Sequence, residues 1–451
     1  MREITLAEML DAREARALRQ QELLREYRCP LVSFTLNIPG PVKDSPLIRR
    51  GYETGRARLE AALKAAGTEI LRREEKLAPT GPELLLAVDA DAAAIKALCL
   101  AIEDWDALGR LFDLDVLAPD GEKLERTSPR RCLVCGRPGR DCASRRLHSV
   151  EELQRAVRRI LTDSLTALDA ERVSRLCTRA LIEELETTPK PGLVDLDNNG
   201  AHLDMCPETF YRSAEALKDY WRDCFLLGAR RRADAPEACF AALRLRGIEA
   251  ERAMLAATGG VNTHKGMIFT LGAVCGAIGR LSSPEAPCRD PEPIAAEAAA
   301  LCREAVDADF AAVRNSGAPR SAGERLYLKF GLAGIRGELA SGLPGVLKYG
   351  LPELSADLAE GLSRNDAGVY ALLRLMARGT DSNLAARGGP EKAAQVSAKA
   401  AALLPRPPMD AVRSFDRELI EAKLSPGGCA DLLAVSYFLY DWARDTGPSQ
   451  E

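Results

Sequence analysis

Two carboxylates stand two residues apart in the apolar segment 109–116, Gly-Arg-Leu-Phe-Asp-Leu-Asp-Val. If this segment forms a strand, Asp113 and Asp115 project from one face, and Leu114 packs on the other. Two like charges held so close are costly unless a cation lies between them, and a divalent ion such as Mg²⁺ is the usual solution. A metal held in this way binds polyphosphate and stabilises the charge of departing pyrophosphate. The spacing therefore predicts a magnesium site that handles phosphate groups.

A second group combines soft metal ligands with positive charge. Cys132, Cys135, Cys142 and His148 lie close together in the sequence, and at this knuckle-like spacing they predict one bound Zn²⁺. Arginines surround them at positions 126, 130, 131, 137, 140, 145 and 146. Guanidinium groups at this density favour a phosphorylated substrate or an acidic partner. The alternative is a reduced, arginine-rich surface loop whose cysteines only pack.

A polar loop from Thr188 to Met205 has a density of acids and amides that packing does not readily explain. Its candidate functional residues are Asp195, Asp197, Asn198, Asn199, His202 and Asp204. Because Asn and Asp favour turns, a purely structural turn is the alternative interpretation.

A glycine-rich loop from Thr258 to Gly266 precedes an apolar helix. Gly259 and Gly260 allow backbone amides and the helix N-terminus to face an anion, and Lys265 adds positive charge. This loop holds His264. A later segment, 381–389, has the same loop character. The 258–266 loop therefore has the features of an anion-binding loop.

Composition restricts the class of protein. The net charge is 62 − 66 = −4, which gives no overall attraction to nucleic acid or membrane. The first residues lack an apolar signal core, and no window approaches the length of a membrane span. The 13 cysteines, an odd number spread along 451 residues, are typical of reduced thiols. We expect a soluble cytoplasmic protein without a membrane segment.

The elements that position these residues differ between the two parts of the chain. Apolar periodicity predicts helices over 7–27, 45–75 and 92–105, and strands over 31–38, 83–89 and 111–117. From about Ser149 onward, alanine- and leucine-rich stretches at helical spacing replace the strand signals. We therefore predict a multidomain protein with an N-terminal mixed α/β (α+β) domain, residues 1–165, followed by a large all-α domain, residues 166–451. The boundary is expected near 162–170.

Both parts contain stretches that resemble known families. Residues 1 to about 165 resemble the apo-citrate lyase phosphoribosyl-dephospho-CoA transferase in 19–24, 35–43, 80–83, 109–116 and 132–148. The remainder resembles triphosphoribosyl-dephospho-CoA synthase in 188–205, 258–266, 334–342 and 381–389. The whole chain is similar to a fusion of the two.

The resemblance implies two consecutive reactions in one bifunctional transferase. The synthase half would join ATP and 3′-dephospho-CoA and release adenine, giving 2′-(5″-triphosphoribosyl)-3′-dephospho-CoA. The other half would transfer phosphoribosyl-dephospho-CoA to a serine of the citrate lyase acyl carrier protein and release pyrophosphate, by nucleotidyltransferase-like chemistry. The implied cofactor is Mg²⁺, and the implied partners are ATP, 3′-dephospho-CoA and the carrier protein.

The resemblance also gives the quoted residues roles. In the transferase, Asp113 and Asp115 would hold Mg²⁺ and Arg110 would offset developing charge; in the synthase, His202 or His264 would be the base. Candidates for Mg²⁺ or charge stabilisation in the synthase are Asp195, Asp197, Asp204 and Asp381. Candidates for substrate binding are Lys190, Asn198, Asn199, Gly259, Gly260, Asn262, Lys265, Arg336, Asn383 and Arg387.

Three alternatives stand beside this interpretation. The equivalent prosthetic-group pathway of malonate decarboxylase uses a similar synthase, but the setting of the 109–116 segment favours citrate lyase. A nucleic-acid-binding protein with a Cys/His knuckle is disfavoured by the acidic balance and the 5% aromatic content. A chain with one active and one decayed half is disfavoured because the motifs of both halves are intact.

Overall fold

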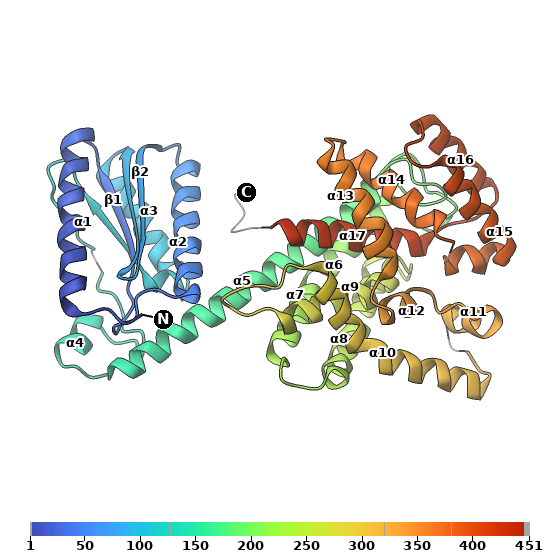
Figure 1. The fold of residues 1–451 in the computed structure, drawn as a ribbon, viewed down its shortest axis with the longest axis horizontal. Helices are drawn as coiled ribbons and strands as arrows, with labels where there is room; N and C mark the ends of the chain where they lie inside the picture. The colour runs from blue at the N-terminus through green and yellow to red at the C-terminus, as the bar shows by residue number, and fades with distance from the viewer. Residues whose placement is uncertain (1, 127, 320, 380, 446–451) are drawn as a thin grey trace. The chain divides into compact units, whose positions relative to one another are not determined.

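The computed structural model describes residues 2–126, 128–319, 321–379 and 381–445 (Figure 1). The chain divides into two compact units. The first comprises the residues up to Ala167, and the second runs from Leu168 to Asp445 without the short segment 284–286. Helix α5 (Val150–Glu186) contributes residues to both units.

The first unit is built on an antiparallel sheet that lies between α1 and α2 in Figure 1. The sheet has four strands in the order β2-β3-β1-β4. The strands are β1 (Leu31–Leu36), β2 (Glu69–Ala78), β3 (Gly81–Asp89) and β4 (Phe112–Leu117). The accompanying helices are α1 (Leu6–Tyr27), α2 (Pro46–Ala65), α3 (Ala92–Asp104) and the short α4 (Gly139–Ser144). A 3₁₀ turn, η1 (Gly109–Leu111), leads into β4.

Each face of the sheet is covered by different helices. Leu23 and Leu24 of α1 pack with Leu31, Leu85 and Ala87 of the sheet. The opposite face carries the larger core, which α2, α3 and the beginning of α5 complete. Strand β4 is at an edge of the sheet, so one side of its backbone has no neighbouring strand.

Strand β2 was not expected, because the sequence predicts a single helix over 45–75. Helix α2 instead ends at Ala65, and the chain turns at Gly67, whose φ is +68°. The following strand is rich in charge, yet it is stable at the sheet edge because neighbouring helices pair its carboxylates. Glu74 accepts from Arg19 of α1, whereas Glu75 accepts from Tyr52 of α2 at 2.9 Å.

The second unit is helical throughout its described residues, apart from loops and turns. Its helices after α5 are α6 (Pro207–Ala216), α7 (Lys218–Arg230), α8 (Pro236–Ala257), α9 (Lys265–Leu281), α10 (Pro291–Ser316), α11 (Ala322–Phe330), α12 (Gly334–Ala340), α13 (Leu351–Ala359), α14 (Arg364–Ala377), α15 (Ser382–Leu403), α16 (Met409–Glu421) and α17 (Gly427–Arg444). A π-helical turn, η2 (Val346–Gly350), precedes α13.

Helix α9 is strongly buried, with 12 of its 17 residues in the core. Helix α9 packs against α7, α8 and α10, and its contact with α7 depends on glycine. A methyl group on Gly228 would come within 2.0 Å of the carbonyl oxygen of Gly276. The two backbones are therefore so close that no side chain fits between them at this point.

The predicted architecture is confirmed at the level of its two parts: a small sheet with helices near the N-terminus and a large helical region after it. The mixed domain is of the antiparallel, α+β kind. Among the residues that the structure describes, no helix has the length and apolar character needed to cross a membrane.

Candidate functional site

The two carboxylates of the 109–116 segment lie side by side on one face of β4. In the antiparallel register Asp113 is opposite Thr35 and Asp115 is opposite Ser33, whereas Leu114 points into the core. The side chains of Asp113 and Asp115 are 42% and 29% exposed, so both carboxylates are accessible to a ligand. The strand geometry is the one that the alternation predicts.

Basic side chains contact both carboxylates. Arg130 Nη2 lies 3.2 Å from Asp113 Oδ1, and Lys123 Nζ donates to Asp115 Oδ2 at 2.7 Å. Arg110 lies nearby on the turn before β4 and donates to the carbonyl oxygens of Cys132 and Arg131 at 2.8 and 3.2 Å. Positive charge thus surrounds the pair, in the manner of a phosphate site.

Two buried charges of α3 hold the open edge of β4. The backbone N–H of Leu114 donates to Glu103 Oε1 at 2.8 Å, and Lys96 Nζ donates to the Leu114 carbonyl oxygen at 3.2 Å. Glu103 also accepts from Arg126 at 2.8 Å and from Arg130. Burial raises the pKa of Glu103. The contacts with Leu114 fix the backbone of β4 between the two aspartates. The contact between Glu103 and Arg130 also holds Arg130 beside Asp113.

A broad cleft of about 1700 Å³ opens at this edge of the first unit. Both aspartates line it, together with much of the arginine-rich loop that follows β4. Its basic lining residues include Arg110, Lys123, Arg126, Arg130, Arg131, Arg140 and Arg146. Two carboxylates and several guanidinium groups therefore line one cavity.

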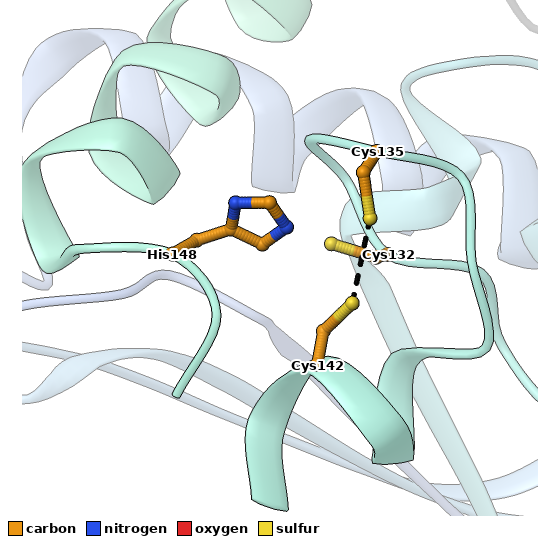
Figure 2. A group of neighbouring side chains, drawn as sticks. All are labelled: Cys132, Cys135, Cys142 and His148. Carbon is orange, nitrogen blue, oxygen red and sulfur yellow. Dashed lines mark hydrogen bonds between the residues drawn. The ribbon is translucent and has the colours of Figure 1, made fainter. Parts of the chain in front are cut away.

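The predicted zinc ligands come together at the border of the same cleft (Figure 2). The ligand atoms of Cys132, Cys135, Cys142 and His148 all lie within 4.8 Å of one another. Cys135 Sγ and Cys142 Sγ are 3.4 Å apart. The hydrogen bond with Cys135 raises the pKa of Cys142 to about 12, whereas backbone and thiol hydrogen bonds hold the pKa of Cys132 below its usual value despite partial burial.

In the second unit, hydrogen bonds to two aspartates fix the conformation of the loop 188–205. Asp195 is fully buried and accepts from the backbone N–H groups of Lys190, Asp197 and Asn198, at 2.9, 2.8 and 3.0 Å. Asn198 Nδ2 donates to Asp416 of α16 at 2.9 Å. Asp195 thus organises the loop, and burial raises its pKa.

The other predicted synthase acids lie in separate environments. Asp197 pairs with Arg413, and Asp204 is 66% exposed. Asp381 caps α15, accepting from the N–H groups of Asn383 and Leu384 and of Cys429 in α17. Among the described residues, these four aspartates do not form a cluster of metal-ligand atoms; Asn199, next to them in sequence, is exposed.

The two loop histidines, His202 and His264, contact different side chains. His264 Nδ1 is 2.6 Å from Ser213 Oγ, and its buried Nε2 has no hydrogen-bond partner among the described residues. Burial, aided by nearby Lys190, lowers the pKa of His264 to about 3. His202 instead contacts Ser425 Oγ at 3.0 Å and Arg387, 3.2 Å from its Nδ1. Burial and Arg387 lower the pKa of His202, so both rings are neutral at pH 7.

The remaining substrate candidates are spread over the helical unit. Lys265 pairs with Glu251, its N–H donates to Asn262 Oδ1 at 3.3 Å, and the side chain is 50% exposed. Space around Gly259 and Gly260 is open, but the Gly260 N–H donates to the Leu255 carbonyl at 2.7 Å and caps α8. That amide is therefore not available to a phosphate in this conformation.

Arg336 and Asn383 lie apart from the loop histidines in the chain and have partners of their own. Arg336 Nη1 is 3.6 Å from Asp309 and 3.9 Å from Glu324. Asn383 lies in the first turn of α15, where a methyl group on Gly427 would come within 2.8 Å of its amide nitrogen.

Comparisons with known proteins cover both units. Residues 4–164 match the family model of the apo-citrate lyase phosphoribosyl-dephospho-CoA transferase (CitX), and residues 170–449 match that of the ATP:dephospho-CoA triphosphoribosyl transferase (CitG). "Protein CitXG" of Haemophilus influenzae is 34% identical in an alignment of 464 positions that covers 96% of this chain and 96% of that protein. The chain belongs to the CitX–CitG fusion family.

A second relative matches the CitG part alone. A protein of Vibrio cholerae named "Probable 2-(5''-triphosphoribosyl)-3'-dephosphocoenzyme-A synthase" is 44% identical in an alignment of 276 positions that covers 60% of this chain and 87% of that protein. The family resemblance inferred from the motifs is confirmed. The chain is a bifunctional transferase for the synthesis and attachment of the citrate lyase prosthetic group.

Sequence reasoning missed residues in both parts. In the CitX part, the missed residues are Lys96 and Glu103, which are buried and lie seven residues apart on the apolar face of α3. Charged residues at apolar positions of a helix are the signal, because a buried charge needs a bonding partner. In the CitG part, Glu184 is buried and accepts from Lys190 Nζ at 2.6 Å.

Asp431 of α17 is another missed residue. It is only partly buried, and its carboxylate lies against the backbone of Gly266 at the start of α9. Burial, with Glu184 and Asp381 nearby, holds the pKa of Asp431 well above its ordinary value. A carboxylate on the strongly apolar α17 is the signal that would have identified it.

Proposed function

We propose that the CitG part makes the activated donor and that the CitX part attaches it to the carrier protein. In the first reaction the 2′-hydroxyl of 3′-dephospho-CoA bonds to the anomeric carbon of ATP, and adenine leaves. In the second, a carrier serine bonds to the α-phosphorus of the resulting triphosphate, and pyrophosphate leaves. The observation that carries the second assignment is the exposed Asp113–Asp115 pair on an arginine-lined cleft.

We propose Asp113 and Asp115 as the ligands of Mg²⁺ in this cleft. Their carboxylates are adjacent, exposed and held on a fixed strand, which suits a hard cation that keeps several of its waters. When bound, Mg²⁺ would neutralise charge on the phosphates. Lys123 and Arg130 contact the pair and line the same cleft, so both would also be available to phosphate oxygens bound there.

The arginines of the cleft would stabilise the negative charge that develops on the departing pyrophosphate. Pyrophosphate departs with more charge than the bridging phosphate carried, so fixed guanidinium groups favour the transition state. Arg110 and Arg130 are tied to the loop and to Glu103, respectively, and this limits the reorganisation needed when charge develops. The cavity volume exceeds that of an ordinary small-ligand site, in keeping with a large nucleotide donor.

In the CitG part we propose that His264 and Asp431 flank the reacting centre. His264 stays neutral, and its unpartnered Nε2 is suited to accept a hydrogen bond from the attacking hydroxyl. Asp431, whose pKa is raised, would stay protonated and donate a proton to departing adenine. Lys190 connects the surroundings of these two residues. It donates to Glu184, which lies near Asp431, and it is close enough to His264 to lower the pKa of that histidine.

The test is a complete reaction with the full chain. Incubation with ATP, 3′-dephospho-CoA, Mg²⁺ and apo-carrier protein should release adenine and pyrophosphate and increase the carrier's mass by one phosphoribosyl-dephospho-CoA group. Without carrier, adenine should appear but pyrophosphate should not. An unmodified carrier together with an absence of adenine would overturn the proposal.

A further inference from the structure

The segment between β4 and α5, which includes α4, brings together four side chains of the kinds that bind metal ions. We propose that Cys132, Cys135, Cys142 and His148 bind one structural Zn²⁺ that fixes this segment beside the transferase cleft. Their ligand atoms lie within 4.8 Å of one another, and Figure 2 shows three thiols and one imidazole nitrogen directed to a common centre. In a tetrahedral site with Zn–S bonds of about 2.3 Å, sulfur atoms are about 3.8 Å apart, so only a small adjustment of this cluster is needed.

The backbone around the first two cysteines has the form of a metal-binding turn. The Cys132 N–H donates to the Arg137 carbonyl oxygen at 2.7 Å, and the Gly136 N–H donates to the Cys132 carbonyl oxygen at 3.1 Å. Gly136 has a φ of +72°, which lets the chain reverse directly after Cys135. The Val134 N–H points at Cys132 Sγ from 3.5 Å, so the turn also fixes the direction of this thiol.

A carboxylate lies near the ring nitrogen of His148 that does not face the cysteines. Ser149 and Glu152 form a reciprocal cap at the start of α5, with N–H to side-chain distances of 2.8 and 3.2 Å. The same Glu152 carboxylate lies 3.9 Å from His148 Nδ1. His148 Nε2 is buried without a hydrogen-bond partner among the described residues, and it faces the cysteines (Figure 2). A carboxylate behind a ligating histidine is the usual support of a zinc site.

The donor set indicates a structural ion. Three thiolates and a neutral imidazole fill a tetrahedral shell and leave no position for substrate. The ion would then act through this segment: the Cys132 carbonyl accepts from Arg110, and Arg130, two residues earlier, reaches Asp113. Zinc would hold both arginines in place at the cleft, although it would not itself touch the substrate.

Metal analysis of the full chain, purified in reductant without chelator, tests the proposal. We expect about one zinc per chain in the wild type and in Cys206→Ser, a partly exposed cysteine of the other unit, and little in Cys142→Ser or His148→Gln. Because these variants could fail to fold, the wild type is also stripped and titrated with Co²⁺. A tetrahedral cobalt spectrum with thiolate charge-transfer bands at one equivalent is expected.

The activity readout separates this inference from the proposed function. Removing the metal should lower carrier modification by about tenfold or more, as loss of a supporting shell does, and leave adenine release unchanged. Zinc-free wild type that gives no cobalt spectrum would overturn the proposal. So would a Cys135–Cys142 disulfide found by peptide mass mapping of the non-reduced chain, or an unchanged zinc content in folded Cys142→Ser.

Discussion

Aspartates that look alike in the sequence have different roles in the structure, and their exposure and partners distinguish them. Asp113 and Asp115 face a cleft and are themselves partly exposed, so a ligand can reach them. Asp195 and Asp381 are buried and accept backbone N–H groups, so their oxygens already stabilise local structure. Accessibility, rather than the density of acids in the sequence, marks the pair suited to metal and phosphate.

Asp431→Asn tests the acid proposed for the synthase. Because general-acid catalysis contributes about 10²–10⁴-fold, adenine release should fall by at least about 100-fold. Attachment of separately supplied triphosphoribosyl donor to the carrier should stay at the wild-type rate. Adenine assays with and without supplied donor measure both effects, and undiminished adenine release would contradict the role.

The same substitution has a predictable effect on stability. A carboxyl group whose pKa is raised in the folded state stabilises the fold below its unfolded pKa, and this contribution is lost as pH rises through the folded pKa. Asp431 is such a group, because burial raises its pKa. The unfolding free energy of the wild type should therefore fall as pH rises above the usual aspartate range, and more steeply than that of Asp431→Asn. Parallel slopes in denaturant titrations at several pH values would contradict this.

At the scale of elements, the sequence predicted β4 well and β2 poorly, for a physical reason. Strand β4 alternates apolar and polar residues because one face is buried and the other faces a cleft. Strand β2 lies at the opposite edge, where its charges pair with helices and need no apolar alternation. The approach of Asp431 to Gly266 joins two segments far apart in the chain, so no local pattern predicts it.

The glycine contact between α7 and α9 allows a test at this scale. Gly228→Ala should destabilise the helical unit by about 1–3 kcal/mol, because the added methyl group meets the Gly276 carbonyl and the helices must separate. Gly323→Ala in α11 is the matched control, since a methyl group there meets no atom within 4 Å. Thermal unfolding compares them; equal melting temperatures would show that the helices do not meet this closely.

At the scale of the whole molecule, each candidate site draws its residues from one unit. Asp113, Asp115 and the Cys/His cluster belong to the first unit, and His264 and Asp431 belong to the second. Fusion therefore joins two consecutive activities without requiring a shared site. The sequence alone supported this organisation because the two parts differ in secondary structure and each carries its own family motifs.

Self-contained sites predict complementation between inactive chains. A mixture of Asp113→Asn chains, which retain synthesis, with Asp431→Asn chains, which retain attachment, should modify the carrier once donor accumulates in solution. Each variant alone should fail from ATP and 3′-dephospho-CoA. Carrier mass over time measures recovery, and a mixture as inactive as its parts would show that the intermediate does not pass between chains.

The central claim is that Asp113 and Asp115 form the transferase site, and separation of the two activities tests it most directly. Asp113→Asn and Asp115→Asn are compared with wild type and with Asp120→Asn, a control in the turn after β4 that keeps its hydrogen bond to the Glu122 N–H. Because metal-assisted charge stabilisation is worth several kcal/mol, carrier modification should fall by at least about 100-fold in the two site variants while adenine release is unchanged. Loss of adenine release with intact carrier modification would contradict the account.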